Sequence, residues 1–269
     1  MVYGKKGVVV RVLYLVASIF LWLVTFGGRL FQSSTVILCY HGITSFQVNE
    51  FRLQMQLVAD RVSAIDTRRV RQGRRWGPSV IITFDDAFEN LLNNALPTIN
   101  ELKIPISIYV VTGCMGGKPP WLANSNHKDE YNKLMSDEQV KLLGTNPLVT
   151  FGVHSHTHPS LTSIDADFVK MELRQSKEKL EDLISRKVDS LAFPHGAFNA
   201  SILSVAKSCG LTQLLTLEEK MINAHQFQGK MGRFSMEPDV WPIEFRLTVD
   251  GAYSWLFYFR RMIRLLKNL

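Results

Sequence analysis

A chain of 269 residues, 46% of them hydrophobic, can bury one substantial core and fits a single α/β domain better than two small ones. Its net charge of +7 is concentrated at the two ends, because residues 1–32 and 251–269 each carry four basic residues and no acidic one. Subtracting these eight charges leaves −1 for residues 33–250, which argues against an extended nucleic-acid-binding face and predicts no nucleic-acid partner.

The first predicted element is an apolar segment close to the N-terminus. The uncharged residues Val12 to Gly28 lie between Arg11 and Arg29 and are rich in Leu, Val, Ile, Phe and Trp. This length is at the short end of what crosses a bilayer, so residues 1–32 are predicted to form a transmembrane anchor; a cleaved signal peptide or a buried core helix are the alternatives. Basic residues mostly precede the segment, so the positive-inside rule places the rest of the chain outside the cytoplasm, in the periplasm or at the cell surface.

From Thr35 onward short apolar runs alternate with helical patterns, which is typical of βα units around a largely parallel sheet or barrel. Strands are predicted at Val36–Tyr40, Val80–Phe84, Ile106–Val111, Val149–Val153, Ser190–Phe193 and Leu211–Leu215.

Helices are predicted between these strands. One runs from Phe88 to Leu102, where Pro97 can divide it, and another covers residues 166–185, with Lys and Glu on its outer face. The segment Gly113–Pro147, around Trp121, is either a loop that shapes a substrate groove or a plain connector with a short helix at Ser136–Leu143. Residues 251–269 are predicted to form a basic amphipathic C-terminal helix, lying on anionic lipid or packed on the domain.

Polar residues follow four of the predicted strands at the point where each strand ends. The side chains concerned are His41, Asp85, Asp86, His154, His158 and His195. In a parallel α/β barrel the carboxyl ends of all strands open on one face, so we expect these residues to meet in one pocket.

The residue types in this set indicate a catalytic metal site. Consecutive side chains of a regular strand point to opposite sides, so Asp85 and Asp86 can serve one site only if the backbone turns there. A bound cation would let both acids stay ionised, one as a ligand and one as a proton acceptor. His154 and His158 are four residues apart and can reach one ion, and two imidazoles with one carboxylate leave coordination positions open for chemistry.

Two segments, ITFDDAFENLLNNALPTINELKIPISIYVVTG and VTFGVHSHTHPSL, resemble the first two signature motifs of the polysaccharide deacetylase (NodB-homology) family. The resemblance covers roughly Val36 to Leu215 and implies a distorted (β/α) barrel for residues 33–250. It also implies that Asp85 is the general base and that Asp86, His154 and His158 bind the metal, with His156 at a variable position.

The chain departs from the family pattern at three places. The motif TFDDG reads TFDDA, and the third motif, usually R-x-P-[YF], reads Ala192-Phe193-Pro194-His195, so its Arg is missing. The late Leu-x-His motif, which supplies the general acid in many members, is also absent. However, Cys39-Tyr40-His41-Gly42-Ile43 resembles the branch typified by exopolysaccharide deacetylases, which places that acid in an early Tyr-His sequence.

The resemblance implies metal-dependent hydrolysis of the acetamide of N-acetylated sugars in a polysaccharide or oligosaccharide, with N-acetylglucosamine as the expected unit. A divalent metal, zinc before cobalt or nickel, would activate water for Asp85, the backbone N–H of His195 would hold the oxyanion, and His41 would protonate the leaving amine. Two other hypotheses stay open: a catalytically degenerate, carbohydrate-binding relative, and a non-haem iron oxygenase with the same ligand types.

Overall fold

The computed structural model describes residues 7–25, 27, 34–70, 78–223 and 229–267. Within these ranges the centre of the molecule is a ten-stranded sheet whose path runs β10-β1-β3-β4-β5-β6-β7-β9, with every neighbouring pair on this path parallel. The long strands are β1 (Ser34–Tyr40), β3 (Ser79–Phe84), β4 (Ile106–Val110) and β5 (Val149–Val153). The short ones are β2 (Ser63–Ala64), β6 (Ser190–Ala192), β7 (Gln213–Leu215), β8 (Ile222–Asn223), β9 (Gly229–Met231) and β10 (Phe234–Ser235).

The sheet curls into a half-barrel, and the chain itself joins its two ends. β9 and β10 lie at opposite ends of the strand path, yet only Gly232 and Arg233 separate them in sequence. Because two residues span at most about 10 Å between flanking strands, the curl must bring these ends close together. This seam between β9 and β10 places Arg233 among buried side chains.

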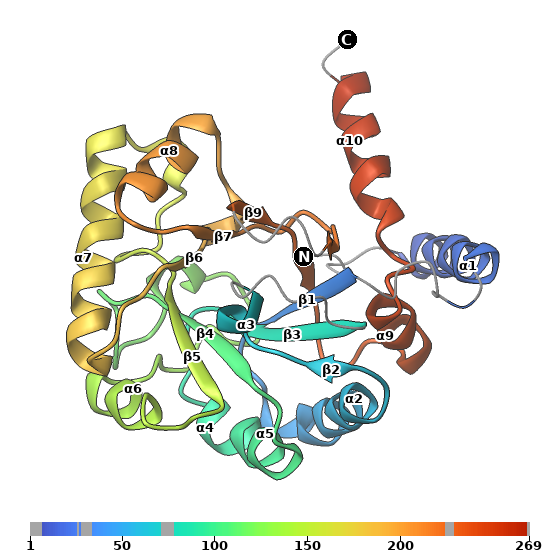
Figure 1. Cartoon of the computed structure of the whole chain (residues 1–269), viewed down its shortest axis with the longest axis horizontal. Helices are drawn as coiled ribbons and strands as arrows, with labels where there is room; N and C mark the ends of the chain where they lie inside the picture. The colour runs from blue at the N-terminus through green and yellow to red at the C-terminus, as the bar shows by residue number, and fades with distance from the viewer. Residues whose placement is uncertain (1–6, 26, 28–33, 71–77, 224–228, 268–269) are drawn as a thin grey trace.

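Helices cover the outer side of the curled sheet in Figure 1. They are α2 (Val48–Arg61), α4 (Leu91–Asn94), α5 (Leu96–Leu102), α6 (Asp137–Leu143), α7 (Ala166–Ile184) and α8 (Ala200–Ser208). The short α3 (Thr67–Val70) follows β2 and does not belong to this layer; its Thr67 hydroxyl lies 3.1 Å from that of Ser107 in β4. Pro97 stands in the first turn of α5, so it begins a new helix after α4, as its missing N–H favours. Ser136 caps α6 by accepting from Gln139 N–H, which confirms the short helix predicted there.

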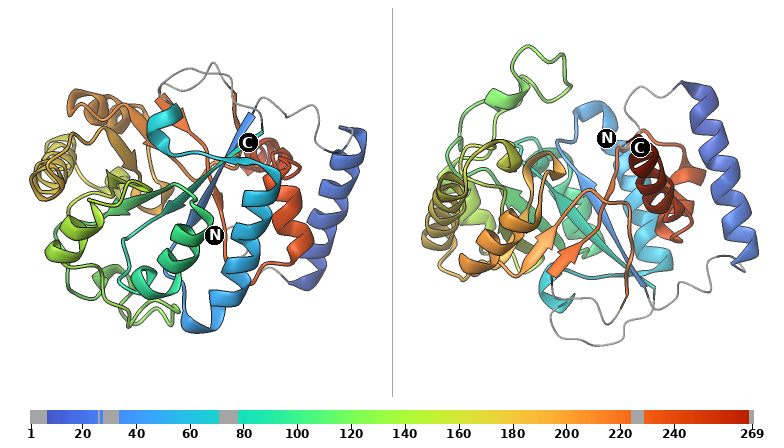
Figure 2. Two further views of the ribbon diagram at one scale, coloured as in Figure 1. Left: turned by 60° about the horizontal axis from the view of Figure 1, so that its bottom comes forward. Right: turned by 90° about the horizontal axis from the view of Figure 1, so that it is seen from above.

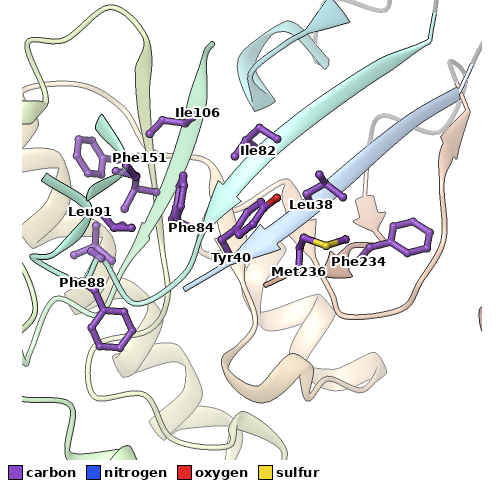
Figure 3. Packing of buried hydrophobic residues seen from close by; sticks show 14 of the residues in the cluster. Leu38, Tyr40, Ile82, Phe84, Phe88, Leu91, Ile106, Phe151, Phe234 and Met236 are labelled. Carbon is purple, nitrogen blue, oxygen red and sulfur yellow. The ribbon is translucent and has the colours of Figure 1, made fainter. Parts of the chain in front are cut away.

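Every residue of β1, β3, β4 and β5 is buried, as expected for a parallel sheet with both faces covered. One side packs against the helices; Leu38, Tyr40, Ile82, Phe84 and Ile106 belong to this outer core, as Figure 3 shows. A smaller cluster fills the inside of the curl and includes Ile37, Ile81, Tyr109, Leu215 and Met231.

All six strands predicted from the sequence are confirmed, with bounds shifted by at most two residues. The two- and three-residue strands β2, β8, β9 and β10 were not predicted, because so few residues show no alternation of side chains.

The apolar N-terminal segment forms α1 (Val8–Val24). The prediction of a transmembrane anchor is not supported, since none of the described helices is both long and apolar enough to cross a membrane. α1 instead lies at the edge of the molecule against α9 (Pro242–Val249) and the start of α10 (Trp255–Lys267) in Figure 2. The contacts are polar as well as apolar: Arg11 pairs with the buried Glu244, and Trp255 Nε1 donates to Ser18 Oγ at 2.9 Å.

Candidate active site

The strand ends meet at one cleft, as the sequence predicted. His41 follows β1, Asp85 and Asp86 follow β3, His154 and His158 follow β5, and His195 lies just after β6. All six side chains line a cavity of about 550 Å³, which is the size of a small-molecule site.

Asp86, His154 and His158 form a group that could hold a metal ion, because one ligand atom from each lies within 4.8 Å of the others. Asp86 Oδ1 is 3.6 Å from His154 Nε2 and 3.5 Å from His158 Nε2. This buried oxygen has no hydrogen-bond partner among the described residues, and burial together with the neighbouring Asp85 raises the pKa of Asp86. A carboxylate without compensating charge beside two imidazole nitrogens is what a divalent cation would neutralise, so the residues fit one.

The orientation of His154 suits a ligand. Its Nδ1 lies 2.7 Å from the carbonyl oxygen of Ala192, which can only accept, so Nδ1 carries the proton and Nε2 offers a lone pair towards Asp86. Burial lowers the pKa of His154 to about 4, against the opposing effect of Asp85. The ring is therefore neutral at physiological pH, which is the form that binds metals.

A buried glutamate from α7 shapes the loop that carries the two histidines. Glu172 Oε2 accepts from the backbone N–H groups of His156 and Thr157, both at 2.8 Å, and Oε1 accepts from Thr157 Oγ1 at 2.7 Å. His158 N–H donates to Ser155 Oγ, and both residues have a positive φ of 64°. The helical pattern predicted the glutamates of α7 on its outer face, which is wrong for Glu172, because this side chain accepts from the backbone N–H groups of the loop.

Asp85 lies beside this group because the chain turns sharply after β3. Asp86 and Ala87 have φ values of 69° and 57°, so the expected break from strand geometry is present and both carboxylates face the same cleft. Ala87 takes the left-handed conformation that the family's glycine would adopt more easily, so the turn is kept in spite of the substitution.

Arg233 holds the Asp85 carboxylate from the seam between β9 and β10. Its Nη1 donates to Oδ1 at 2.6 Å and its Nη2 to Oδ2 at 2.8 Å, and both side chains are buried. Burial raises the pKa of Asp85, but Arg233, with a smaller contribution from His154, outweighs burial and holds that pKa well below its usual range. Asp85 is therefore ionised at any physiological pH.

The third motif lacks its arginine, but Arg233 supplies a guanidinium to the Asp85 carboxylate from another part of the chain. Arg233 could not be recognised from the motif, because the family pattern places its arginine beside Pro194. The available signal was a single basic residue inside the apolar run Met231-Gly232-Arg233-Phe234. Such a residue in a buried seam needs an anionic partner.

His41 lies close to Asp85 on the other side of the cleft. A ring nitrogen of His41, a carboxylate oxygen of Asp85 and Cys39 Sγ lie within 4.8 Å of one another. Burial lowers the pKa of His41, while Asp85 and Asp129 raise it by stabilising the imidazolium. Asp129, which belongs to none of the sequence motifs, is buried under Gly42, and within the described part of the chain its Oδ2 has no hydrogen-bond partner.

His195 and Trp121 border the group of possible metal ligands. The exposed His195 has φ 58°, in a tight turn just after β6, and its ring centroid is 4.6 Å from that of His158. Trp121 also contacts His158: the two rings stack with their centroids 4.1 Å apart at an interplanar angle of 20°. Two predictions were made for residues 113–147, a loop that shapes a substrate groove and a plain connector. The first is favoured, because Trp121, Leu122 and His127 line the cavity.

A curled parallel sheet that gathers a carboxylate and two imidazoles beside a second, arginine-bound carboxylate defines an α/β protein with a site suited to a divalent cation. The family model described as polysaccharide deacetylase matches residues 72–214, just over half of the chain, and the chain belongs to this family.

A poly-beta-1,6-N-acetyl-D-glucosamine N-deacetylase of Staphylococcus aureus (strain MRSA252) is 27% identical over 161 residues, which cover 56% of this chain and 52% of that protein. The chain therefore matches about half the length of this curated relative.

Two solved structures share the fold. IcaB from Ammonifex degensii aligns with a TM-score of 0.66 at 19% identity, covering 81% of this chain and 97% of IcaB. The Streptococcus pyogenes deacetylase PplD, solved in complex with acetate, aligns with a TM-score of 0.65 at 19% identity, covering 80% of this chain and 98% of PplD.

Proposed function

We propose that the chain is a metal-dependent N-deacetylase that hydrolyses the acetamide of N-acetylated sugars in a polysaccharide or oligosaccharide. The observation that carries this proposal is the group Asp86, His154 and His158 beside an ionised Asp85 in one cleft. The substrate class follows the name of the S. aureus relative, which acts on a polymer of N-acetyl-D-glucosamine. Such a substrate favours a location outside the cytoplasm.

Asp86, His154 and His158 would hold the divalent metal, and zinc fits their nitrogen and oxygen donors, with cobalt or nickel as alternatives. When bound, such an ion polarises a carbonyl oxygen and lowers the pKa of water. Asp85 then serves as general base: Arg233 keeps it ionised and fixes its plane, so it accepts the proton of the attacking water.

His41 and His195 act on the other atoms of the acetamide. The backbone N–H of His195, presented by the turn after β6, donates to the oxyanion of the tetrahedral intermediate. His41 donates a proton to the leaving amine, and the carboxylate of Asp129 stabilises the charged imidazole before that transfer.

The test is acetate release from N-acetylglucosamine oligomers by zinc-, cobalt- or nickel-loaded protein. Asp85→Asn should retain its metal and lose activity by at least about a hundredfold, as removal of a general base does. Asp182→Asn, a change of the same kind on the exposed side of α7, should behave as wild type. Equal activity of Asp85→Asn and wild type would refute the assigned base.

The same assay separates the two alternatives. Glycan binding without acetate release for any of the three metals would identify a carbohydrate-binding relative, the hypothesis raised by the missing motif arginine. Arg233 weakens that hypothesis, because it binds the carboxylate of Asp85, the proposed general base. Turnover that requires Fe(II) and oxygen would identify an oxygenase, whereas a deacetylase works without oxygen.

A further inference from the structure

α1 has two faces of different character. The inner face contacts α9 and α10 through Arg11, Tyr14, Ser18 and Trp22: Trp22 Nε1 donates to Asp250 Oδ2 at 2.9 Å, and the Tyr14 ring packs edge-on against Trp255. The outer face consists of exposed apolar side chains only. They are Val9, Val12, Leu13, Val16, Phe20, Leu23 and Val24.

These outward residues recur with each turn of the helix, at steps of three or four with two adjacent pairs (Val12 and Leu13, Leu23 and Val24), so they form a continuous stripe along it. We call these seven residues the α1 stripe. It contains no polar or charged group, and its seven side chains are each more than a third exposed. Proteins seldom leave a contiguous apolar surface of this kind facing water unless it contacts a partner or a membrane.

The charges of α10, the helix on which α1 docks, favour an anionic partner. α10 begins where α1 docks, since Tyr14 packs against both Trp255 and Phe259. α10 carries four basic residues and no acidic one, whereas residues 33–250 have a net charge of −1. α10 also exposes Met262, Leu265 and Leu266. Apolar side chains beside basic ones are the signature of a helix that lies in the headgroup region of an anionic bilayer.

The inner face of α1 reaches the catalytic cleft. The Arg11 guanidinium lies 4.0 Å from the centre of the Trp241 ring and pairs with buried Glu244, and Arg11 is one of the residues that line the cleft. One helix therefore contributes to the wall of the active site on one side and presents the α1 stripe on the other.

We propose that the α1 stripe and the exposed side of α10 dock the protein peripherally on an anionic lipid surface, with α1 lying in the plane of the interface. This arrangement differs from a transmembrane span, because the polar contacts of Arg11, Ser18 and Trp22 keep one side of α1 on the protein. It places α1 between the catalytic cleft and the lipid surface.

The test is co-flotation of the full chain with vesicles of phosphatidylcholine, with or without phosphatidylglycerol. We expect binding to the anionic vesicles to be about tenfold or more stronger than to phosphatidylcholine alone, and to fall at high salt. The triple variant Val16→Ser, Phe20→Ser, Leu23→Ser removes residues that are 58%, 66% and 60% exposed and should lose this binding about tenfold.

The matched control is Phe46→Ser, Leu53→Ser, Leu142→Ser, whose side chains are 92%, 65% and 73% exposed elsewhere on the surface. This variant should bind vesicles as wild type does. Leu265→Ser with Leu266→Ser tests α10 separately and should weaken binding without any change in α1. Thermal melting of each variant confirms that it is folded, and acetate release from soluble oligomers, which does not depend on docking, should be unchanged.

Four results would overturn the proposal. They are a wild-type chain that does not float with anionic vesicles, an α1-stripe variant that floats as well as wild type, association that resists alkaline carbonate as a spanning helix does, and a dimer in sedimentation that the triple variant abolishes. The last would mean that a second copy of the chain covers the α1 stripe.

Discussion

Arg233 and Asp85 are 148 residues apart in sequence and form a two-point hydrogen-bonded ion pair inside the curled sheet, with both side chains buried. The pair fixes the plane of the Asp85 carboxylate and keeps it ionised, while Asp85 in turn neutralises an arginine that the seam between β9 and β10 forces into the interior. Each residue makes the burial of the other tolerable.

Weakening this pair should change the pH dependence of activity. Burial raises the pKa of Asp85 and Arg233 lowers it, so Arg233→Lys, which replaces a two-point donor by a single one, leaves burial less opposed and raises that pKa. The acid limb of the kcat/KM profile should therefore move to higher pH. Arg246→Lys, on half-exposed α9 surface, is the control; an unchanged acid limb for Arg233→Lys would contradict the role given to Arg233.

Asp129 should matter for the protonated form of His41. The variant Asp129→Asn keeps the size of the side chain and its contact with Asn132. It removes the negative charge that raises the pKa of His41. The alkaline limb of the rate profile should then shift to lower pH, and kcat should fall about tenfold at neutral pH. Asp167→Asn, exposed on α7, should leave both unchanged. A loss of kcat with no shift of the alkaline limb would indicate a merely structural role.

Glu172 should control metal affinity although it does not belong to the ligand group. Its carboxylate accepts three hydrogen bonds from the loop between His154 and His158, and Glu172→Gln turns one acceptor oxygen into a donor that faces other donors. We expect the dissociation constant for zinc, measured by chelator competition, to rise about tenfold to a hundredfold, as for other groups that orient metal ligands. Glu178→Gln, exposed on the same helix, should not change it.

Metal binding should also stabilise the fold. An ion that binds only the folded chain adds about 2.7 kcal/mol at a concentration one hundred times its Kd. The Tm of the wild type should therefore rise with zinc and fall again with a chelator. Asp86→Asn should show no such rise, and Asp182→Asn should show all of it; a zinc-dependent Tm in Asp86→Asn would mean that the ion binds elsewhere.

The sequence determined the strands and the local motifs. The apolar runs of β1, β3, β4 and β5 are fully buried, which is why they could be recognised without a structure. Asp86, His154 and His158 could be predicted as one group because each follows such a strand and parallel strands end on one face.

The tertiary structure alone decided which distant residues complete the site and what α1 contacts. Arg233, Asp129 and Glu172 carry no local signal of their partners, since those partners come from other strands and loops. The apolar composition of α1 is equally compatible with lipid and with protein, and only its contacts with α9 and α10 show that one face lies on the domain. Periodicity and motifs report a residue's own element, whereas a pairing across 148 residues exists only once the sheet has curled and its two ends have met.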